Sequence, residues 1–508
     1  MFPSTQKRLA DLAVKPENTY VSSEEDVDSK NMTGKKENAK ITFCGGVSSV
    51  TGANFLLDIN KMNDEGMITS KKILIDCGME QGSEQAKIYN ASPFIFDPKE
   101  TEILLVTHAH MDHIGLIPKL IKHGFRGVIY STPETRDLCV YMLDDALKLV
   151  TQAALEHETE PLYAAEDVAL AFQLWKTIPY HTEFKLCSFG AGENSEISVY
   201  LKDAGHVLGS SMFEIRIPLN GIQRKFLFTG DLGNSPCPIL KDTEPIEGVD
   251  YVVMESVYGD RNHEDKKDRL HKLQLAVEDT IDRNGILLIP SFSLEKTQEV
   301  LFELHKLFED GAVRPIPIYL DSPLAIKLLP TYRKYTKDYN KEATDRRLKG
   351  EDFLNFKQLH IVGSAEESKA IKFAKNPKII MAGSGMSTGG RIMHHELNYL
   401  DDDNTILLFM GFQALGTLGR EIKDGAKKVT IYGHEVRIKC EIRSIDGYSG
   451  HKDSDNLQEF VSTTADTVKK VFVTMGETKS ALFLVQRLRD YQGIDAVHPA
   501  QGDTVTLR

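Results

Sequence analysis

Four side chains that can bind a metal ion are concentrated in six residues of this sequence. They are His108, His110, Asp112 and His113, and an apolar segment at 102–106 precedes them. In an extended segment, side chains two residues apart point to the same side, so His108 and His110 face one volume. Imidazole and carboxylate donors suit Zn²⁺, with Fe or Mn as less favoured occupants. A polar loop at a strand end is the alternative, but four donors in six residues favour a metal site.

Two later loops offer the remaining ligands. His206 lies among small residues directly after an expected strand at 196–202, and Asp231 follows an expected strand at 224–228. Taken alone, His206 would be an ordinary partly buried histidine and Asp231 a turn residue. Because three donor segments follow three expected strands in order, we predict that they close around one metal centre.

The loops that carry these donors must be positioned by strands and helices, which the sequence indicates as short apolar runs separated by Gly and Asp. They predict strands at 41–44, 54–57, 72–76, 102–106, 196–202, 212–217 and 224–228, and helices at 114–122, 138–156 and 164–177. This β-rich pattern with helices between strands is typical of two sheets sandwiched by helices.

After about Tyr258 the pattern changes to alternating helices and strands. Helices are predicted at 266–283, 293–308, 325–339 and 391–399, and strands at 286–289, 315–320, 378–381 and 405–409. Such alternation favours a parallel sheet covered by helices on both faces. From about Thr430 the sequence reads as strands again, to the C-terminus. We therefore predict an α/β domain at 258–435 inserted into a first domain formed by 40–257 and 436–508.

The bulk properties fit a multi-domain globular chain. The 508 residues are 41% hydrophobic and 27% charged, and no run of about 18 apolar residues occurs. Residues 1–39 lack the pattern of a secretory signal and are rich in Lys, Glu, Asp, Ser and Asn, which predicts a loosely attached tail with a short helix at 5–14. We expect a cytoplasmic protein without a membrane segment.

Cysteine usage and charge narrow the possible functions. The six cysteines, none in a C-x-x-C spacing, read as small buried residues in a reducing compartment, not as a disulfide framework or zinc ribbon. The net charge of −13 argues mildly against a nucleic-acid substrate. It does not exclude one, because binding depends on local patches and on the charge of bound metal.

The donor segments resemble the metal motifs of the metallo-β-lactamase superfamily. The matching segments are THAHMDH at 107–113, DAGHVLGSS at 203–211 and FTGDLG at 228–233, and Asp76 in LIDCG resembles the first acidic motif. The resemblance implies one metal held by His108, His110 and His206. It also implies a second metal held with the help of Asp112 and His113, and Asp231 as the bridge between the two.

The inserted region resembles the β-CASP branch of that superfamily. The segments are MESVYGDRNHE at 254–264, PSFSLEKTQEVL at 290–301, DSPLA at 321–325, GSGMSTGGRIMHHEL at 383–397, GFQALGTLGREI at 411–422 and GYSGH at 447–451. The branch includes the nuclease subunit of the cleavage and polyadenylation specificity factor and bacterial ribonuclease J. The resemblance is closest to bacterial and archaeal relatives of the polyadenylation nuclease. It implies an α/β fold, with a metallo-β-lactamase αββα sandwich and an inserted α/β β-CASP domain.

This resemblance implies a metal-dependent ribonuclease with Asp76, Asp112, Glu255 and His451 as catalytic residues. Glu255 matches the acidic residue of motif A and His451 the histidine of motif B. A metal-activated hydroxide, oriented by Asp76, would attack phosphorus, and His451 supported by Glu255 would protonate the leaving 3′ oxygen. The expected partner is single-stranded RNA. A DNA nuclease and a non-cleaving nucleic-acid-binding paralogue are the alternatives, and a homodimer is an open possibility.

A glycine-rich stretch at 383–390 is a candidate phosphate site. Backbone N–H groups before the expected helix at 391–399, with Ser384, Ser387, Thr388 and Arg391, could surround a phosphate. A lone glycine cluster more often marks a turn, and the family resemblance favours the binding role. A basic stretch from Lys327 to Lys349, interleaved with tyrosines, could track RNA. We expect its tyrosines to pack inward and leave the role of its charges open.

One position departs from the family pattern. The branch usually carries a histidine, motif C, where this sequence has Met475 in VFVTMGETKS at 471–480. A thioether is a poor Zn²⁺ ligand beside oxygen and imidazole donors. Water could fill the vacant position, the second metal could be held weakly, or the chain could act on DNA or another phosphoester. We therefore expect one firmly held Zn²⁺ and a weaker second ion, with Mn²⁺ as another occupant.

Overall fold

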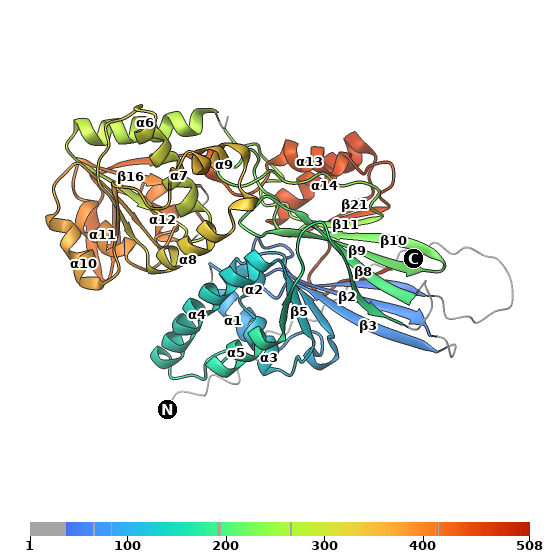
Figure 1. Cartoon of the computed structure of the whole chain (residues 1–508). Helices are drawn as coiled ribbons and strands as arrows, with labels where there is room; N and C mark the ends of the chain where they lie inside the picture. The colour runs from blue at the N-terminus through green and yellow to red at the C-terminus, as the bar shows by residue number, and fades with distance from the viewer. Residues whose placement is uncertain are drawn as a thin grey trace. The chain divides into compact units, whose positions relative to one another are not determined.

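The computed structural model describes residues 37–63, 67–82, 84–189, 195–264, 267–411, 413–414 and 416–508. Within these residues the chain forms three large sheets and one two-stranded sheet (Figure 1). The helix predicted at 5–14 lies outside the described residues, and the first described strand begins at Asn38. Over the same residues, no helix combines the length and the apolar character needed to span a membrane.

The first two sheets face each other, as the strand pattern predicts. The first has the order β22 (Thr504–Leu507), β1 (Asn38–Gly45), β2 (Asn54–Met62), β3 (Ile68–Ile75), β4 (Ile103–Leu105), β5 (Val128–Ser131), β6 (Trp175–Thr177). The second has the order β21 (Ala496–Val497), β20 (Lys470–Val473), β11 (Tyr251–Met254), β10 (Ile222–Phe228), β9 (Ser211–Leu219), β8 (Glu196–Asp203), β7 (Glu183–Ser188). Phe43 of β1 and Phe472 of β20 meet between them, with ring centroids 5.2 Å apart. Their contact lies in the buried apolar layer that holds the sandwich together.

Helices cover the outer faces of this sandwich (Figure 1). Those beside the first sheet are α1 (Glu84–Ala91), α2 (Met111–Ile114), α3 (Ile117–Lys122), α4 (Pro133–Glu156) and α5 (Ala165–Leu174). Those beside the second sheet are α13 (Ser454–Ser462) and α14 (Thr478–Gln492), whose Leu457 and Leu484 pack with Val252 and Val471 of the strands. The layers therefore form an αββα sandwich, which confirms the predicted fold class.

The third sheet belongs to the inserted region. Its order is β14 (Leu359–Ile361), β13 (Ile318–Asp321), β15 (Lys378–Ala382), β12 (Ile286–Pro290), β16 (Thr405–Phe409), β19 (Glu441–Ser444), and all neighbours are parallel. Around it lie α6 (Lys267–Asp282), α7 (Lys296–Glu309), α8 (Pro323–Lys334), α9 (Lys341–Leu348), α10 (Ala365–Ala370), α11 (Ile392–Tyr399) and α12 (Leu418–Lys423). β17 (Lys428–Ile431) and β18 (His434–Arg437) form the two-stranded sheet. Every residue of β12 is buried, as expected for a strand covered on both faces.

Some predicted elements are wrong in type or extent. The helix predicted at 164–177 ends at Leu174, because Trp175–Thr177 pairs with β5 as strand β6. The helix predicted at 114–122 is two short helices, α2 and α3. The strands predicted from Thr430 to the C-terminus are interrupted by α13 and α14, whose buried residues recur at helical spacing. A short apolar segment is compatible with a helix or a strand, and in each case strand pairing or helix packing in the folded protein determines which one forms.

The boundaries of the insertion stay a prediction. β19 pairs with β16 of the third sheet, although we predicted the return to the first domain at residue 436. We therefore propose to place that return after Ser444, just before the segment that carries His451.

Candidate metal centre

Parallel strands of the sandwich deliver the candidate residues to one place. In the second sheet β8, β10, β11 and β20 run in one direction, and their ends precede His206, Asp231, Glu255 and Met475. In the first sheet β3 and β4 are parallel and end before Asp76 and His108. The carboxyl ends of parallel strands lie at one edge of a sheet, so these loops converge although they are far apart in sequence.

One group of donors consists of three imidazoles and a carboxylate. His108 Nε2 lies 3.0 Å and His206 Nε2 3.2 Å from His110 Nδ1. Asp231 Oδ2 is 3.5 Å from the nitrogen of His108 and 3.4 Å from that of His206. One donor atom from each of the four residues lies within 4.8 Å of the others. The structure thus brings together the first predicted ligand set.

The protonation of these imidazoles suits metal binding. Burial, together with the neighbouring imidazoles, holds the pKa of His108 and His206 well below the usual histidine range. Burial likewise lowers the pKa of His110 to about 3. Neutral imidazoles keep a free lone pair, which is the form that binds a cation. His206 Nδ1 lies 2.9 Å from the Gly450 carbonyl, a donor hydrogen bond that leaves Nε2 free as the ligand atom.

A second group of donors consists of Asp112, His113 and Asp231. His113 Nε2 is 3.4 Å from Asp231 Oδ1 and 3.9 Å from Asp112 Oδ2. Asp231 therefore turns one oxygen toward each donor group. Burial alone would raise the pKa of Asp231, but the surrounding imidazoles, His113 first, hold it well below its usual range. Asp231 is thus an anion placed between two sets of ligands.

Two orphaned atoms test whether a cation fits here. His113 Nε2 and Asp231 Oδ1 are fully buried and face each other at 3.4 Å, and among the described residues neither makes a hydrogen bond of standard geometry. Burial would lower the pKa of His113, yet the carboxylates of Asp231 and Asp76 outweigh it and raise that pKa well above the usual value. The surroundings therefore favour positive charge at this nitrogen, and a bound cation would satisfy both orphaned atoms.

Asp76 contacts His113 on the ring nitrogen that points away from Asp231. Its carboxylate accepts hydrogen bonds from Thr107 N at 2.8 Å and Thr107 Oγ1 at 2.8 Å, and it lies 2.7 Å from His113 Nδ1. Both oxygens are thus occupied inside the protein, and Asp76 is completely buried. Its contacts orient His113. Thr107, which completes this support, was not singled out from the sequence, although it precedes His108 directly.

Glu255 and His451 form a pair beside Asp231. His451 Nδ1 lies 3.1 Å from Glu255 Oε1 and 3.9 Å from Asp231 Oδ2. Glu255 also accepts a hydrogen bond from the backbone N–H of Leu232 at 2.6 Å. Burial acts to lower the pKa of His451, but the carboxylates of Glu255 and Asp231 raise it to about 9. A buried carboxylate therefore fixes the ring of His451 and stabilises its protonated form.

Met475 lies at the turn where the sequence places motif C. It follows β20, and its backbone N–H donates to the Gly46 carbonyl at 2.7 Å. Its side chain is buried in the apolar layer between the two sheets, together with Val47 and Ala53. Met475 has a backbone φ of +48°, a conformation in which His is more common than Met. The turn is thus retained while its side chain contributes packing.

The structure divides the candidate phosphate residues into two kinds. Ser387 is buried and donates to Glu396, and Arg391 donates to Asp321 Oδ1 at 2.5 Å. Thr388 instead is exposed and Ser384 is half-buried, and their hydroxyls are 3.2 Å apart. The hydroxyls of Ser293 and Ser322, which the sequence did not single out, lie near Gly383 at the same place. The four candidates therefore differ in their contacts: Ser387 and Arg391 are held by acidic side chains, and Ser384 and Thr388 by each other.

Most charges of the basic stretch at 327–349 form ion pairs within the protein. Tyr332 donates to Glu295 at 2.7 Å and Tyr335 to Asp137 at 2.7 Å, so these tyrosines pack within the protein, as expected. The charges, which the sequence left undecided, form ion pairs: Lys327, Lys334 and Lys337 pair with Asp144, Asp137 and Glu134 of α4, and Arg333 and Arg347 with Asp352. The three lysine pairs connect the inserted region to the sandwich, whereas the two arginine pairs lie within the inserted region.

The cysteines are free thiols, as the sequence predicted. All six are unpaired, and five of them are buried.

Comparisons with known proteins agree with this geometry. Residues 67–223 match the metallo-beta-lactamase superfamily domain, 297–422 the Beta-Casp domain and 435–499 the Zn-dependent metallo-hydrolase RNA specificity domain. Ribonuclease TTHA0252 of Thermus thermophilus is 34% identical over 446 residues, which are 88% of this chain and 95% of that protein. Transcription termination factor FttA of Methanosarcina mazei is 30% identical over 474 residues, which are 90% of this chain and 69% of that protein.

The resemblance first seen in short motifs therefore extends over the three domain types and nearly the whole length of a relative. The first matched domain lies in the sandwich, the second in the inserted region, and the third mainly in the part of the chain that returns to the sandwich. On these grounds the chain belongs to the metallo-β-lactamase superfamily, within its β-CASP branch.

Proposed function

We propose that this protein is a metal-dependent ribonuclease that hydrolyses phosphodiester bonds of single-stranded RNA. The observation that carries the proposal is the position of Asp231, which turns one oxygen to each donor group and lies beside the His451–Glu255 pair. Phosphodiester hydrolysis needs charge neutralisation on the phosphate and a proton for the leaving oxygen. The similarity to a ribonuclease over 88% of the chain supports RNA as the substrate.

The donor types favour Zn²⁺. His108, His110, His206 and Asp231 would hold one ion, and Asp112, His113 and Asp231 a second one that is bound more weakly because Met475 offers no suitable donor. Mn²⁺ is a second possible occupant of the oxygen-rich group. When bound, such ions supply Lewis acidity to phosphate oxygens and make a water molecule a stronger acid.

The protein's own residues then have distinct tasks. Asp76 keeps the ring of His113 in the orientation that aims Nε2 at Asp231. Glu255 holds Nδ1 of His451, so that the other ring nitrogen can deliver a proton to the leaving 3′ oxygen. Asp112 and Asp231 supply negative charge that balances bound cations.

The hydroxyls of Ser384 and Thr388 are our candidates for binding an RNA phosphate outside the reaction centre. Replacing both by alanine is expected to raise KM for RNA at least about tenfold and to leave kcat within twofold, because each hydrogen bond to a charged group contributes about 1.5–3 kcal/mol. Steady-state cleavage of labelled RNA measures both constants, with Thr159→Ala, an exposed threonine elsewhere, as the control. A fall in kcat at unchanged KM would assign these hydroxyls to another role.

Substrate class is tested with matched RNA and DNA oligonucleotides of one sequence. Metal-loaded protein is expected to cleave the RNA at least about 100-fold faster than the same protein after chelation, since metal ions stabilise transition-state charge by several kcal/mol. Faster cleavage of the DNA would favour the DNA-nuclease alternative. Absence of cleavage of either strand by the metal-loaded protein would favour the non-cleaving paralogue. Light scattering of the same sample would decide whether the chain is a homodimer.

Met475→His is expected to tighten binding of the second ion about tenfold or more, because it restores an imidazole donor where the thioether offers none. The left-handed backbone at this position accommodates histidine. Metal retained after dialysis, measured by elemental analysis, checks the prediction alongside RNA cleavage rates. Met475→Leu, which keeps an apolar side chain of similar volume, is the matched control. Equal retention in the two variants would show that residue 475 does not limit the second ion.

A further inference from the structure

A second group of possible metal donors lies outside the Asp231 centre. Cys237 follows β10 in the sandwich, and Glu295 and Glu299 lie at the start and in the first turn of α7. One donor atom from each lies within 4.8 Å of the others, and all three residues are buried. We propose that Cys237, Glu295 and Glu299 form a separate binding site for a thiophilic divalent cation, for which Zn²⁺ is the best match.

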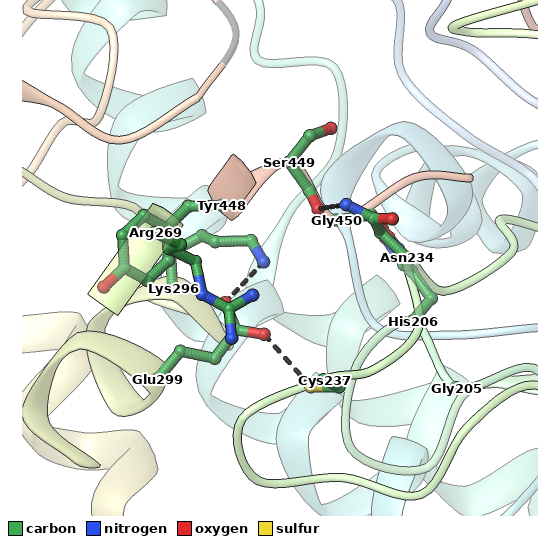
Figure 2. Close-up of a pocket in the computed structure, with 10 residues that line it drawn as sticks. All are labelled: Gly205, His206, Asn234, Cys237, Arg269, Lys296, Glu299, Tyr448, Ser449 and Gly450. Atoms are coloured by element: carbon green, nitrogen blue, oxygen red, sulfur yellow. Dashed lines mark hydrogen bonds and ion pairs between the residues drawn. The ribbon is translucent and has the colours of Figure 1, made fainter. Parts of the chain in front are cut away.

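The hydrogen bond between Cys237 and Glu299 indicates where the cation would bind. Cys237 Sγ donates to Glu299 Oε1 at 3.1 Å, and Figure 2 shows the two side chains pointing at each other. Around tetrahedral Zn²⁺, bond lengths of about 2.3 Å to sulfur and 2.0 Å to oxygen place those two ligand atoms about 3.5 Å apart. A cation can therefore replace the proton after the two side chains separate by a few tenths of an ångström.

Glu295 supplies the independent evidence for a missing partner. Its Oε2 accepts hydrogen bonds from Tyr332 Oη at 2.7 Å and from the backbone N–H of Leu208 at 3.0 Å. Its Oε1 has no hydrogen-bond partner among the residues that the structure describes, although Glu295 is 0% exposed. A buried polar atom without a hydrogen-bond partner is costly, and coordination of a cation by the deprotonated side chain would satisfy it.

A small cavity beside the group has room for a fourth ligand. Its volume is about 10 Å³, which is close to the space that one water molecule needs. Cys237, Glu299 and Lys296 line it, together with His206 and Gly450 (Figure 2). Three protein donors and one water complete a tetrahedral site. This site adjoins the Asp231 centre and shares none of its ligands.

Two basic side chains, Lys296 and Arg269, lie near the proposed site, and their positive charge would repel a cation unless it is balanced. Lys296 Nζ is paired with Glu299 Oε2 at 2.6 Å, and Arg269 is paired with Glu303 at 2.9 Å, so both cations already have anionic partners. Burial, and then the charge of Glu299, raises the pKa of Glu295 to about 8, so this carboxyl carries a proton at neutral pH. Binding one divalent cation would release the Cys237 thiol proton and the Glu295 carboxyl proton to solvent. The net charge of the group is then unchanged.

Such a cation would tie the sandwich to the inserted region. Cys237 belongs to the segment between β10 and β11, whereas Glu295 and Glu299 belong to α7 beside the third sheet. Glu295 already contacts the His206 loop through the N–H of Leu208. The proposal concerns a structural site and does not depend on whether the Asp231 centre cleaves RNA.

Cobalt substitution tests the proposal without an activity measurement. Metal-free protein is titrated with Co²⁺ alone, and the near-ultraviolet charge-transfer band of thiolate bound to Co²⁺ is recorded. Imidazole and carboxylate ligands give no such band, and in the described part of the chain no other cysteine belongs to a group of three donors. Wild-type protein is expected to develop the band. Cys237→Ser is expected to lack it and to bind one Co²⁺ equivalent fewer per chain.

The matched control is Cys187→Ser, which changes a half-buried thiol of β7 and is expected to keep both the band and the equivalent. Glu295→Gln keeps the shape of the side chain and is expected to weaken the affinity reported by the band at least about tenfold. If Cys237→Ser does not fold, the Glu295→Gln titration decides alone. No band in the wild type, a band that survives Cys237→Ser, or unchanged affinity in Glu295→Gln would each overturn the proposal.

Discussion

Asp231→Asn is expected to lower kcat for single-stranded RNA by at least about 10³-fold, because it removes the anion that faces both donor groups at once. Asparagine keeps the size of the side chain but lacks the charge that balances bound cations. The loss should therefore come with a loss of metal from the centre. Steady-state cleavage and elemental analysis of the same preparations measure the two effects.

Asp242→Asn is the matched control, since Asp242 is an exposed aspartate in the loop that follows the same strand. It is expected to leave both kcat and metal content unchanged. Cleavage by Asp231→Asn within tenfold of the wild type would mean that Asp231 does not hold the ions that the reaction needs. Equal loss in both variants would point to a general effect of charge on RNA binding.

His451→Ala is expected to lower kcat by about 10²–10⁴-fold, the usual contribution of a general acid, while the metal content stays at the wild-type level. The expected retention of metal follows from the position of His451, whose Nδ1 is 3.1 Å from Glu255 and 3.9 Å from Asp231. Single-turnover cleavage of labelled RNA, which isolates the chemical step from product release, is the measurement.

His157→Ala, an exposed histidine at the end of α4, is the control for histidine removal and is expected to behave as the wild type. Glu255→Gln should give a smaller loss, about 10–100-fold, because glutamine can still contact the His451 ring but cannot stabilise its charge. If His451→Ala lost metal in proportion to activity, His451 would be a ligand and another group would protonate the leaving oxygen.

The ligands of the metal centre that lie close together in the sequence were the easiest to predict. His108, His110, Asp112 and His113 follow one buried strand, so spacing alone indicated a site. His206 and Asp231 could be predicted as ligands only from the order of three segments that each follow a strand. Glu255 and His451 could be predicted only from the resemblance to a family. The final arrangement depends on four strands of one sheet that run in the same direction, which no short segment encodes.

Other contacts could not be inferred because their members are distant in sequence and individually ordinary. Arg391, read as a phosphate ligand, is engaged by Asp321 of β13, seventy residues earlier. Cys237, read correctly as a small buried thiol, meets α7 through the packing of the inserted region on the sandwich. The C-terminal helices were predictable in principle, since buried residues of α13 and α14 recur every three or four positions.

The most direct test of the Asp231 centre is X-ray diffraction from zinc-loaded crystals at wavelengths on both sides of the zinc edge. We expect anomalous density on both sides of Asp231: one peak among His108, His110 and His206, and a second, weaker peak between His113 and Asp112. Zinc density that lies only away from Asp231, or none at all in a protein that still cleaves RNA, would contradict this expectation.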